Sequence, residues 1–191
     1  MGSVRLFVAV NLPAEERAAV WRAAAPLRSA GLPVRWVAEP ALHITLKFLG
    51  DVEEDVAGPL GVALSDAVAG ARPFQLSLSG FGAFPSLERP GVLWLGIERH
   101  PALELLANDV AGAVGRFGFT PQLKPFHPHL TLGRAERDAQ PSDFADLGTL
   151  AVEVEYAGLM RIESVDLMQS TLGRGGPTYT VLHRALLAGD R

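Results

Sequence analysis

Hydrophobic and polar positions along the chain follow two periods, that of a strand and that of a helix. Residues 5–10 form a short apolar run typical of a buried strand, and residues 13–31 carry apolar positions at helical spacing. Pro13 stands where the first helical turn tolerates proline, and Gly31 is a plausible end. Residues 43–50 then alternate polar and apolar side chains, as a strand with one buried face does.

The same succession returns in the second half of the chain. Residues 91–97 predict a strand, residues 101–118 a helix, and residues 119–134 a connection and a further strand. Both passages end on the motif His-x-Thr-x, so the chain contains two approximate repeats, residues 5–50 and 91–134.

The remaining segments complete a mixed fold. Residues 53–70 predict a helix despite an internal proline, and residues 74–84 a strand with a glycine kink. Residues 151–172 and 179–187 predict a long β-hairpin. We therefore expect an α+β fold of two pseudo-symmetric lobes, each a sheet with helices on its outer face. No clean linker separates them, so residues 1–191 are expected to form a single domain of two intertwined lobes.

Composition narrows the classes of function. The chain has 191 residues and a formal net charge of −4, which argues against binding along long nucleic acids, because many phosphate contacts need dense Lys and Arg. It has no cysteine, so disulfides and thiolate chemistry are excluded and any metal would need His, Asp or Glu ligands. No apolar stretch resembles a membrane span or a signal peptide, so we expect a soluble cytoplasmic protein with no membrane partner.

The two His-x-Thr-x motifs carry the candidate chemistry. Because side chains alternate along a strand, His43, Thr45 and Lys47 are expected on one face and the apolar residues between them on the other. His129 and Thr131 follow the same alternation in the second motif. A single such histidine is well explained as a structural residue. Its repetition with threonine is not explained by packing, which would repeat only the apolar positions.

Two imidazoles that face each other suit in-line cleavage of a phosphodiester. The entering oxygen loses a proton on one side of phosphorus while the departing oxygen gains one on the other, so a base and an acid are needed at opposite ends. Histidine titrates near neutral pH and can serve as either. The threonine hydroxyls can donate hydrogen bonds to the non-bridging oxygens, where negative charge develops. This chemistry requires no metal or other cofactor.

The segments that frame the motifs resemble one family. They are, in order, RLFVAVNLP, LHITLKFLG, FQLSLSGFGAFP, GVLWLGI, FHPHLTLGR and LMQSTLGRGGPTYTVL. Over nearly the whole chain they resemble the 2H phosphoesterase superfamily, and within it the RNA 2′,3′-cyclic phosphodiesterases, also described as 2′-5′ RNA ligases. The resemblance implies a bilobal antiparallel-sheet fold with a central cleft. It also implies hydrolysis of a terminal RNA 2′,3′-cyclic phosphate to a 2′-phosphate.

The resemblance further implies a role for each motif residue. His43 would protonate the departing 3′-oxygen, His129 would activate water, and Thr45 and Thr131 would bind phosphate oxygens. Arg134 matches an arginine of the family's second motif and would add a fixed positive charge for the phosphate. Strict alternation would turn Arg134 away from Thr131, so this role requires the strand to end or bulge just before it.

Several other residues have more than one interpretation. His127 could join His43 and His129 in a three-histidine zinc site, although no carboxylate stands at ligand spacing, or it could orient its neighbours. Lys47 could hold RNA phosphates or be a solvated lysine, and Arg174 could contact substrate from a glycine-rich hairpin turn. Four aromatic residues are candidates for stacking on the terminal base or for the core: Phe7, Trp36, Phe81 and Phe84.

The leading functional hypothesis is a metal-independent phosphoesterase that acts on RNA 2′,3′-cyclic phosphate ends, as a monomer with no obligate protein partner. In reverse, the same site would join such an end to a 5′-hydroxyl through a 2′-5′ bond. One alternative keeps the fold but takes a small cyclic nucleotide or an ADP-ribose cyclic phosphate. Another is an RNA-end binding protein without turnover. The histidines and threonines of both motifs favour the enzyme, since a binding protein has no need of a matched acid and base.

Overall fold

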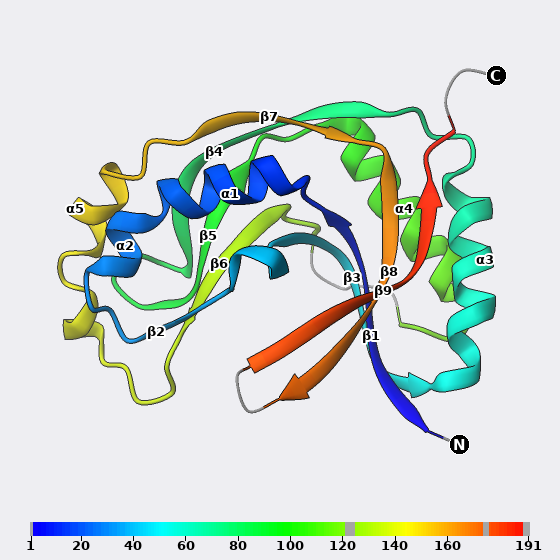
Figure 1. Cartoon of the computed structure of the whole chain (residues 1–191), viewed down its shortest axis with the longest axis horizontal. Helices are drawn as coiled ribbons and strands as arrows, with labels where there is room; N and C mark the ends of the chain where they lie inside the picture. The colour runs from blue at the N-terminus through cyan, green and yellow to red at the C-terminus, as the bar shows by residue number, and fades with distance from the viewer. Residues whose placement is uncertain (1, 121–124, 174–175, 189–191) are drawn as a thin grey trace.

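The computed structural model describes residues 2–120, 125–173 and 176–188. Within them, nine strands form one antiparallel sheet with helices packed against it (Figure 1). The strands are β1 (Ser3–Asn11), β2 (Val34–Trp36), β3 (His43–Glu53), β4 (Phe74–Pro85), β5 (Pro90–Ile97), β6 (His129–Ala135), β7 (Ala157–Ile162), β8 (Ser164–Gly173) and β9 (Gly176–Leu186). The helices are α1 (Ala14–Ala23), α2 (Ala25–Ser29), α3 (Ala57–Val68), α4 (Pro101–Gly115) and α5 (Leu147–Val152), with short 3₁₀ turns η1 (Glu39–Ala41), η2 (Glu54–Val56) and η3 (Pro141–Phe144).

The strand order is symmetrical about the centre of the sheet. It runs β7-β4-β5-β6-β3-β1-β8-β9, with β2 paired to β6 outside this path. Outward from the central β6 and β3, β5 therefore corresponds to β1, β4 to β8 and β7 to β9. The two central strands meet through one residue pair, Ile44 and Leu130. The α+β class and the two similar antiparallel halves are confirmed, and the halves are joined edge to edge into one sheet.

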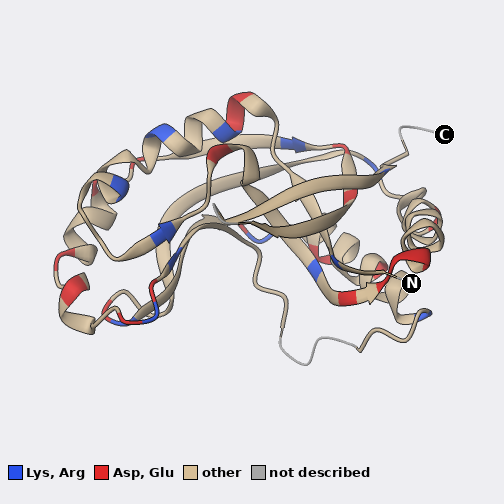
Figure 2. Cartoon of the chain, turned by 60° about the horizontal axis from the view of Figure 1, so that its bottom comes forward, with Lys and Arg blue, Asp and Glu red and all other residues tan. Residues whose placement is uncertain are grey.

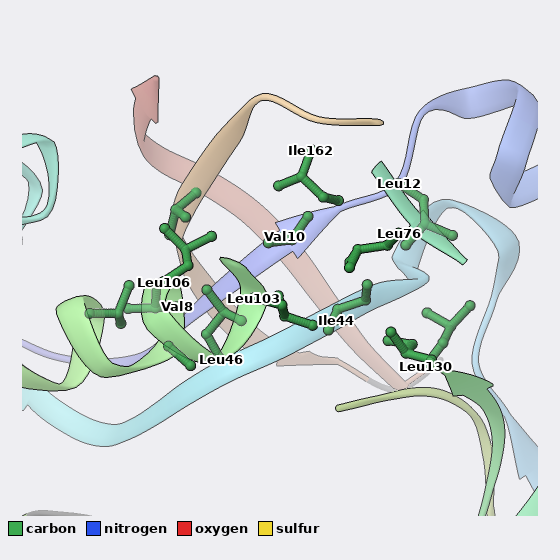
Figure 3. Packing of buried hydrophobic residues seen from close by; sticks show 14 of the residues in the cluster. Val8, Val10, Leu12, Ile44, Leu46, Leu76, Leu103, Leu106, Leu130 and Ile162 are labelled. Carbon is green, nitrogen blue, oxygen red and sulfur yellow. The ribbon is translucent and has the colours of Figure 1, made fainter. Parts of the chain in front are cut away.

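One face of the sheet carries the main hydrophobic core. Along β1, Leu6, Val8 and Val10 belong to this core, whereas Phe7 and Ala9 between them belong to a small cluster on the other face. Helix α4 meets the core with the apolar residues that recur along it at three- and four-residue spacing. Figure 3 shows this packing around Val8, Val10, Leu12, Ile44, Leu46, Leu103 and Leu106.

Each half of the chain contributes a helix to the other half. Helix α4 follows β5 but packs on β3, and α3 packs on α4, β8 and β9. In Figure 1, α1 and α2, which follow β1, lie on the side of β4, β5 and α5, and α2 contacts α5. A hydrogen bond of 2.7 Å from the Tyr156 hydroxyl to Glu16 ties α1 to the segment before β7.

The helix predictions are confirmed, with one interruption. The helix predicted over residues 13–31 is present but divides at Ala24 into α1 and α2, and Gly31 follows it at a φ of 70°. The helix predicted over residues 53–70 begins with η2 and continues as α3. In the part of the chain that the structure describes, no helix has the length and apolar character that crossing a membrane requires.

The strand predictions need one correction in the tail. The strand predicted over residues 151–172 is in fact two strands, because α5 occupies its start and the chain breaks again at Glu163. The first strand, β7, begins at Ala157 and pairs with β4, so only β8 belongs to the hairpin. The hairpin of β8 and β9 is confirmed by their antiparallel pairing, which one bulge in β9 interrupts. The kink expected in β4 is also present, where Gly80 has a φ of 75° and the register with β5 shifts. Arg174 lies outside the described residues.

Candidate active site

The two His-x-Thr-x motifs meet at the centre of the sheet. Ile44 of the first motif pairs with Leu130 of the second, and both side chains are fully buried in the main core. In an antiparallel register, the histidine of each motif then lies opposite the threonine of the other, on the face away from that core. The two histidines are therefore diagonal neighbours, whose Cα atoms in such a ladder lie about 7–8 Å apart. At this backbone spacing, both side chains can reach one phosphate group.

The two imidazoles are held by matching hydrogen bonds. Nδ1 of His43 lies 2.7 Å from the carbonyl oxygen of Ala41, and Nδ1 of His129 lies 2.8 Å from that of His127. Because a carbonyl can only accept, each Nδ1 carries the proton and each Nε2 is left to act as a base, or as an acid once protonated. The expectation that His127 orients a neighbour therefore has a physical basis in its backbone carbonyl.

Aromatic rings flank both histidines, more tightly around the first. The His43 ring lies 4.9 Å from the ring of Phe7 and 5.0 Å from that of Tyr179, which meets it edge-on. Among the described residues, the His129 ring has one such neighbour, Phe84, at 5.1 Å and nearly perpendicular. The hairpin of β8 and β9 thus reaches over the start of β3, and the orientation of His43 is fixed by β1 and β9 together.

A pocket of about 310 Å³ opens beside the first motif. His43, Thr45 and Arg134 lie at one part of its wall. Its other lining residues come from β1, β3 and the hairpin, namely Arg5, Phe7, Phe48, Ser170, Leu172, Pro177 and Tyr179. The pocket therefore combines groups suited to an anion with an apolar, partly aromatic wall.

A bulge in β6 turns Arg134 toward this pocket. Along β5, Leu93 pairs with Gly133 and the next residue, Trp94, pairs with Thr131, so one residue of β6 has no partner. The bulge that a phosphate-facing arginine requires is thus present. A side chain at residue 133 would place its Cβ 2.5 Å from Val34 Cγ1, which explains why glycine stands there.

A second bulge, in β3, overturns the expected placement of Lys47. Val8 pairs with Lys47 and Ala9 with Thr45, so the intervening residue of β3 is unpaired and the alternation reverses after it. Lys47 is only 7% exposed, and its Nζ donates to the Thr120 carbonyl at 2.7 Å. The expectation that Lys47 shares a face with His43 is therefore wrong. Phe48, expected on the apolar face, is instead 52% exposed and lines the pocket.

The surroundings of His43 favour its neutral form in the free protein. Burial has the largest influence and lowers the pKa of His43 below 6.5; the hydrogen bond to Ala41 acts against this, and the positive charge of Arg134 lowers the pKa further. Burial raises the pKa of Tyr179, with Arg134 acting in the opposite direction, so the phenol stays protonated near neutral pH.

These influences predict a shifted titration of His43. In an NMR titration, its imidazole midpoint is expected below 6.5, and Arg134→Gln is expected to raise that midpoint because a neighbouring positive charge is removed. Arg116→Gln, at the end of α4, serves as the control and should leave the midpoint unchanged. An unchanged His43 midpoint in Arg134→Gln would show that the guanidinium does not act on this ring.

The described residues contain no cluster of side chains that could hold a metal ion. Across residues 2–120, 125–173 and 176–188, no three His, Cys, Asp or Glu side chains are gathered closely enough to hold a metal ion. A zinc site built from His43, His127 and His129 is therefore not supported by the geometry of the described residues.

Solved structures share this fold. LigT of E. coli, in its complex with 3′-AMP, superposes with a TM-score of 0.75 at 29% identity, covering 97% of this chain and 99% of that one. TT0787 of Thermus thermophilus gives a TM-score of 0.78 at 31% identity, covering 98% of this chain and 100% of its own. Both comparisons match the whole molecule, both halves of the sheet included.

Sequence comparison defines the family. The sequence model of the 2′-5′ RNA ligase superfamily matches residues 14–174, and the chain belongs to this superfamily. Relatives named RNA 2′,3′-cyclic phosphodiesterase include one from Methanothermobacter thermautotrophicus, 36% identical over 93% of this chain and 95% of its own length. Another, from Escherichia coli (strain K12), is 36% identical over 94% of both chains. The resemblance found in the sequence is thereby confirmed.

Proposed function

We propose that this protein hydrolyses the 2′,3′-cyclic phosphate at the end of RNA to a 2′-phosphate, with His43 and His129 as acid and base and without a metal ion. One observation carries the proposal. Two histidines from remote parts of the chain lie diagonally across two central strands, each with Nδ1 bound to a carbonyl and with no hydrogen bond from Nε2 to any described residue. In-line displacement at phosphorus needs an acid and a base in this opposed arrangement.

The proposed reaction uses each group once. Nε2 of His129 takes a proton from water as its oxygen bonds to phosphorus, and Nε2 of His43 gives a proton to the 3′-oxygen as the phosphorus–oxygen bond breaks. Thr45, Thr131 and the guanidinium of Arg134 stabilise charge on the non-bridging oxygens. The negative cyclic phosphate offsets the charge of Arg134, so substrate binding favours the protonated His43 that the departing oxygen needs.

The charge distribution suits recognition of an RNA end over binding along its length. Figure 2 shows Lys and Arg interspersed with Asp and Glu along the ribbon, without a continuous basic tract. The net charge of −4 agrees with this pattern. A protein that grips many successive phosphates needs a dense positive surface. The substrate is therefore an RNA terminus, held mainly at its last nucleotide.

The same site can run the reaction in the joining direction. If the 5′-hydroxyl of a second RNA takes the place of water, its oxygen bonds to phosphorus, the 3′-oxygen leaves, and a 2′-5′ linkage results. His129 takes the proton of the 5′-hydroxyl as it would that of water, and His43 again gives a proton to the 3′-oxygen, because only the attacking oxygen has changed. Membership of the 2′-5′ RNA ligase superfamily supports this direction. Water is the more abundant acceptor, so hydrolysis is the dominant outcome.

A second candidate is the same chemistry on a small cyclic nucleotide. The pocket of about 310 Å³ is of a size for one nucleotide and little more, which favours this alternative enough to test it. Comparing rates on a mononucleoside 2′,3′-cyclic phosphate and on an oligoribonucleotide with the same end distinguishes the two. A rate that is higher on the oligonucleotide supports RNA, and a higher rate on the mononucleotide supports the small substrate.

Product analysis tests the proposed function. An oligoribonucleotide that ends in a 2′,3′-cyclic phosphate is mixed with the protein in EDTA. Sensitivity to phosphatase then shows whether the ring has opened to a monoester, and analysis of the terminal nucleotide shows whether the phosphate is on the 2′- or the 3′-oxygen. The expected product is a 2′-phosphate, formed at the same rate with and without the chelator. No turnover, or loss of turnover in EDTA with recovery on adding zinc, would contradict the proposal.

Two further parts of the proposal concern the protein in the cell. Both motifs belong to one chain and meet within it, so a monomer suffices for the site. The absence of cysteine from the sequence is compatible with a reducing compartment, and we place the protein in the cytoplasm. Sedimentation of the purified protein tests the first part, and fractionation of cells tests the second.

A further inference from the structure

The pocket extends well beyond the groups that the reaction uses. Past His43 it is lined by Phe48, Arg5 and the hairpin residues Leu172 and Pro177. Phe48 is 52% exposed and Leu172 is 74% exposed, so the wall keeps large apolar surfaces in contact with water. Exposed apolar surface that is gathered in a concave site commonly marks a binding function.

Comparison of the two halves shows what distinguishes this wall. Each histidine motif is followed by a bulge, and five residues after each histidine a side chain turns into the pocket. In the second half this side chain is Arg134, and in the first half it is Phe48. A cationic group therefore faces a flat apolar one across the approximate two-fold axis. A ligand that carries a phosphate at one end and an aromatic plane at the other fits this asymmetry.

Arg5 supports the Phe48 ring from one side. Its guanidinium carbon lies over one face of the ring, 4.9 Å from the centroid, in a cation–π contact. Arg5 pairs with Ser170 in the last β1–β8 pair, which places this contact where the hairpin extends past β1. Phenyl rings and guanidinium planes are both surfaces on which nucleobases stack.

We propose that Phe48, supported by Arg5, forms the stacking surface for the terminal nucleobase, with Leu172 and Pro177 of the hairpin along its edge. The inference rests on the proposed function and adds the position of the nucleoside to it. Stacking uses a ring face that every base has, so little preference among the four bases is expected.

This position of the nucleoside gives the reaction a direction. The departing 3′-oxygen is part of the ribose, so it must face the side on which the nucleoside lies. Among the described residues that line the pocket, His43 is present and His129 is not. The acid is therefore His43, beside the ribose, and His129 faces the opposite side of phosphorus, where water enters. This argument from the pocket agrees with the roles that the family resemblance implies.

The test compares substrates with and without a base. Phe48→Leu keeps an apolar side chain but removes the aromatic plane. On an oligoribonucleotide 2′,3′-cyclic phosphate, its KM is expected to rise about fivefold to a hundredfold, because stacking contributes about 1–3 kcal/mol per base. On the same oligonucleotide with an abasic terminal ribose 2′,3′-cyclic phosphate, KM should not change, and Phe48→Tyr should restore the KM on the normal substrate. Leu105→Ala, exposed on α4, is the control and should alter neither.

Each outcome decides the inference. If Phe48→Leu raises KM equally on the normal and abasic substrates, or raises it on neither, the stacking surface is ruled out while the proposed hydrolysis still stands. If the wild-type protein turns over neither substrate, the proposed function fails separately. In that case the stacking surface is tested by calorimetry, which measures how tightly the wild type and Phe48→Leu bind adenosine 2′-monophosphate and ribose 2′-phosphate. Weaker binding of only the adenosine compound by Phe48→Leu supports the stacking surface, and unchanged binding overturns it.

Discussion

Replacing either His43 or His129 by alanine is expected to lower turnover at least about a hundredfold, with each protein still folded. General acid–base catalysis contributes about 10²- to 10⁴-fold per group, and each imidazole uses Nδ1 for its carbonyl contact, which leaves Nε2 for this task. The measurement is the single-turnover rate on an oligoribonucleotide 2′,3′-cyclic phosphate. Because acid and base act in one step, the fold decrease in rate of the double variant should be much smaller than the product of the two single-variant decreases.

A matched histidine elsewhere separates this effect from general damage. His100 caps α4, accepting a hydrogen bond from the Ala102 amide, and stacks on Phe74. His100→Gln is expected to keep a rate within about twofold of wild type, since surface caps affect stability by about 1 kcal/mol and not the reaction. A near-normal rate in His43→Ala or in His129→Ala would remove that residue from the mechanism.

Arg184→Met is expected to have the largest effect on stability, lowering the free energy of unfolding by about 2–4 kcal/mol. Asp166 is fully buried, and its carboxylate accepts bonds of 2.8 and 2.9 Å from Arg184 and one of 2.6 Å from Asn11. Without Arg184 a buried negative charge keeps one neutral partner. The half-exposed guanidinium reduces the loss relative to a fully buried pair, because water can reach the site. The measurement is the midpoint of urea unfolding.

An exposed ion pair provides the control for this prediction. Arg161 and Glu163 make a similar bond of 2.7 Å, but both side chains are more than half exposed. Arg161→Met is expected to cost less than about 1 kcal/mol. In the double variant Arg184→Met with Asp166→Asn, part of the lost stability should return because the buried charge is removed. A cost in Arg184→Met no greater than that in Arg161→Met would show that the buried carboxylate does not depend on this arginine.

The repeat in the sequence predicted the symmetry of the sheet but not how its halves join. Period and turn residues are local signals, and they placed strands and helices such as β1, α4 and the β8–β9 hairpin. The pairing of Ile44 with Leu130 joins segments far apart in the chain. The packing of α4 on β3 is likewise set by contacts between the halves. No local pattern carries that information.

The site was predicted least well where the strands bulge. Strict alternation placed Lys47 in the pocket and Phe48 in the core, and one unpaired residue in β3 reverses both. Near Gly133 the need for a bulge could be inferred, because strict alternation would turn Arg134 away from the phosphate that it was expected to bind. In the first motif no residue had an expected role that was inconsistent with alternation, so the bulge in β3 could not be inferred. Comparing the two repeats at the same distance from their histidines would have shown that Phe48 corresponds to Arg134.

The aromatic residues around the site depend on tertiary contacts. Among the four stacking candidates, Phe7 touches the ring of His43 and Phe84 that of His129, while Trp36 and Phe81 pack against the core. Tyr179 was not singled out by its sequence, because it reaches His43 only through the folded hairpin. Side chains that hold a histidine ring from a distant strand leave no periodic signal.

The central claim is that both imidazoles act on one phosphorus centre, and a crystal structure with bound phosphate tests it most directly. The account predicts the phosphorus between the two rings, with Nε2 of His43 and Nε2 of His129 each within about 3 Å of a different phosphate oxygen. A phosphate that contacts only one of the two histidines, or that binds away from both, would contradict it.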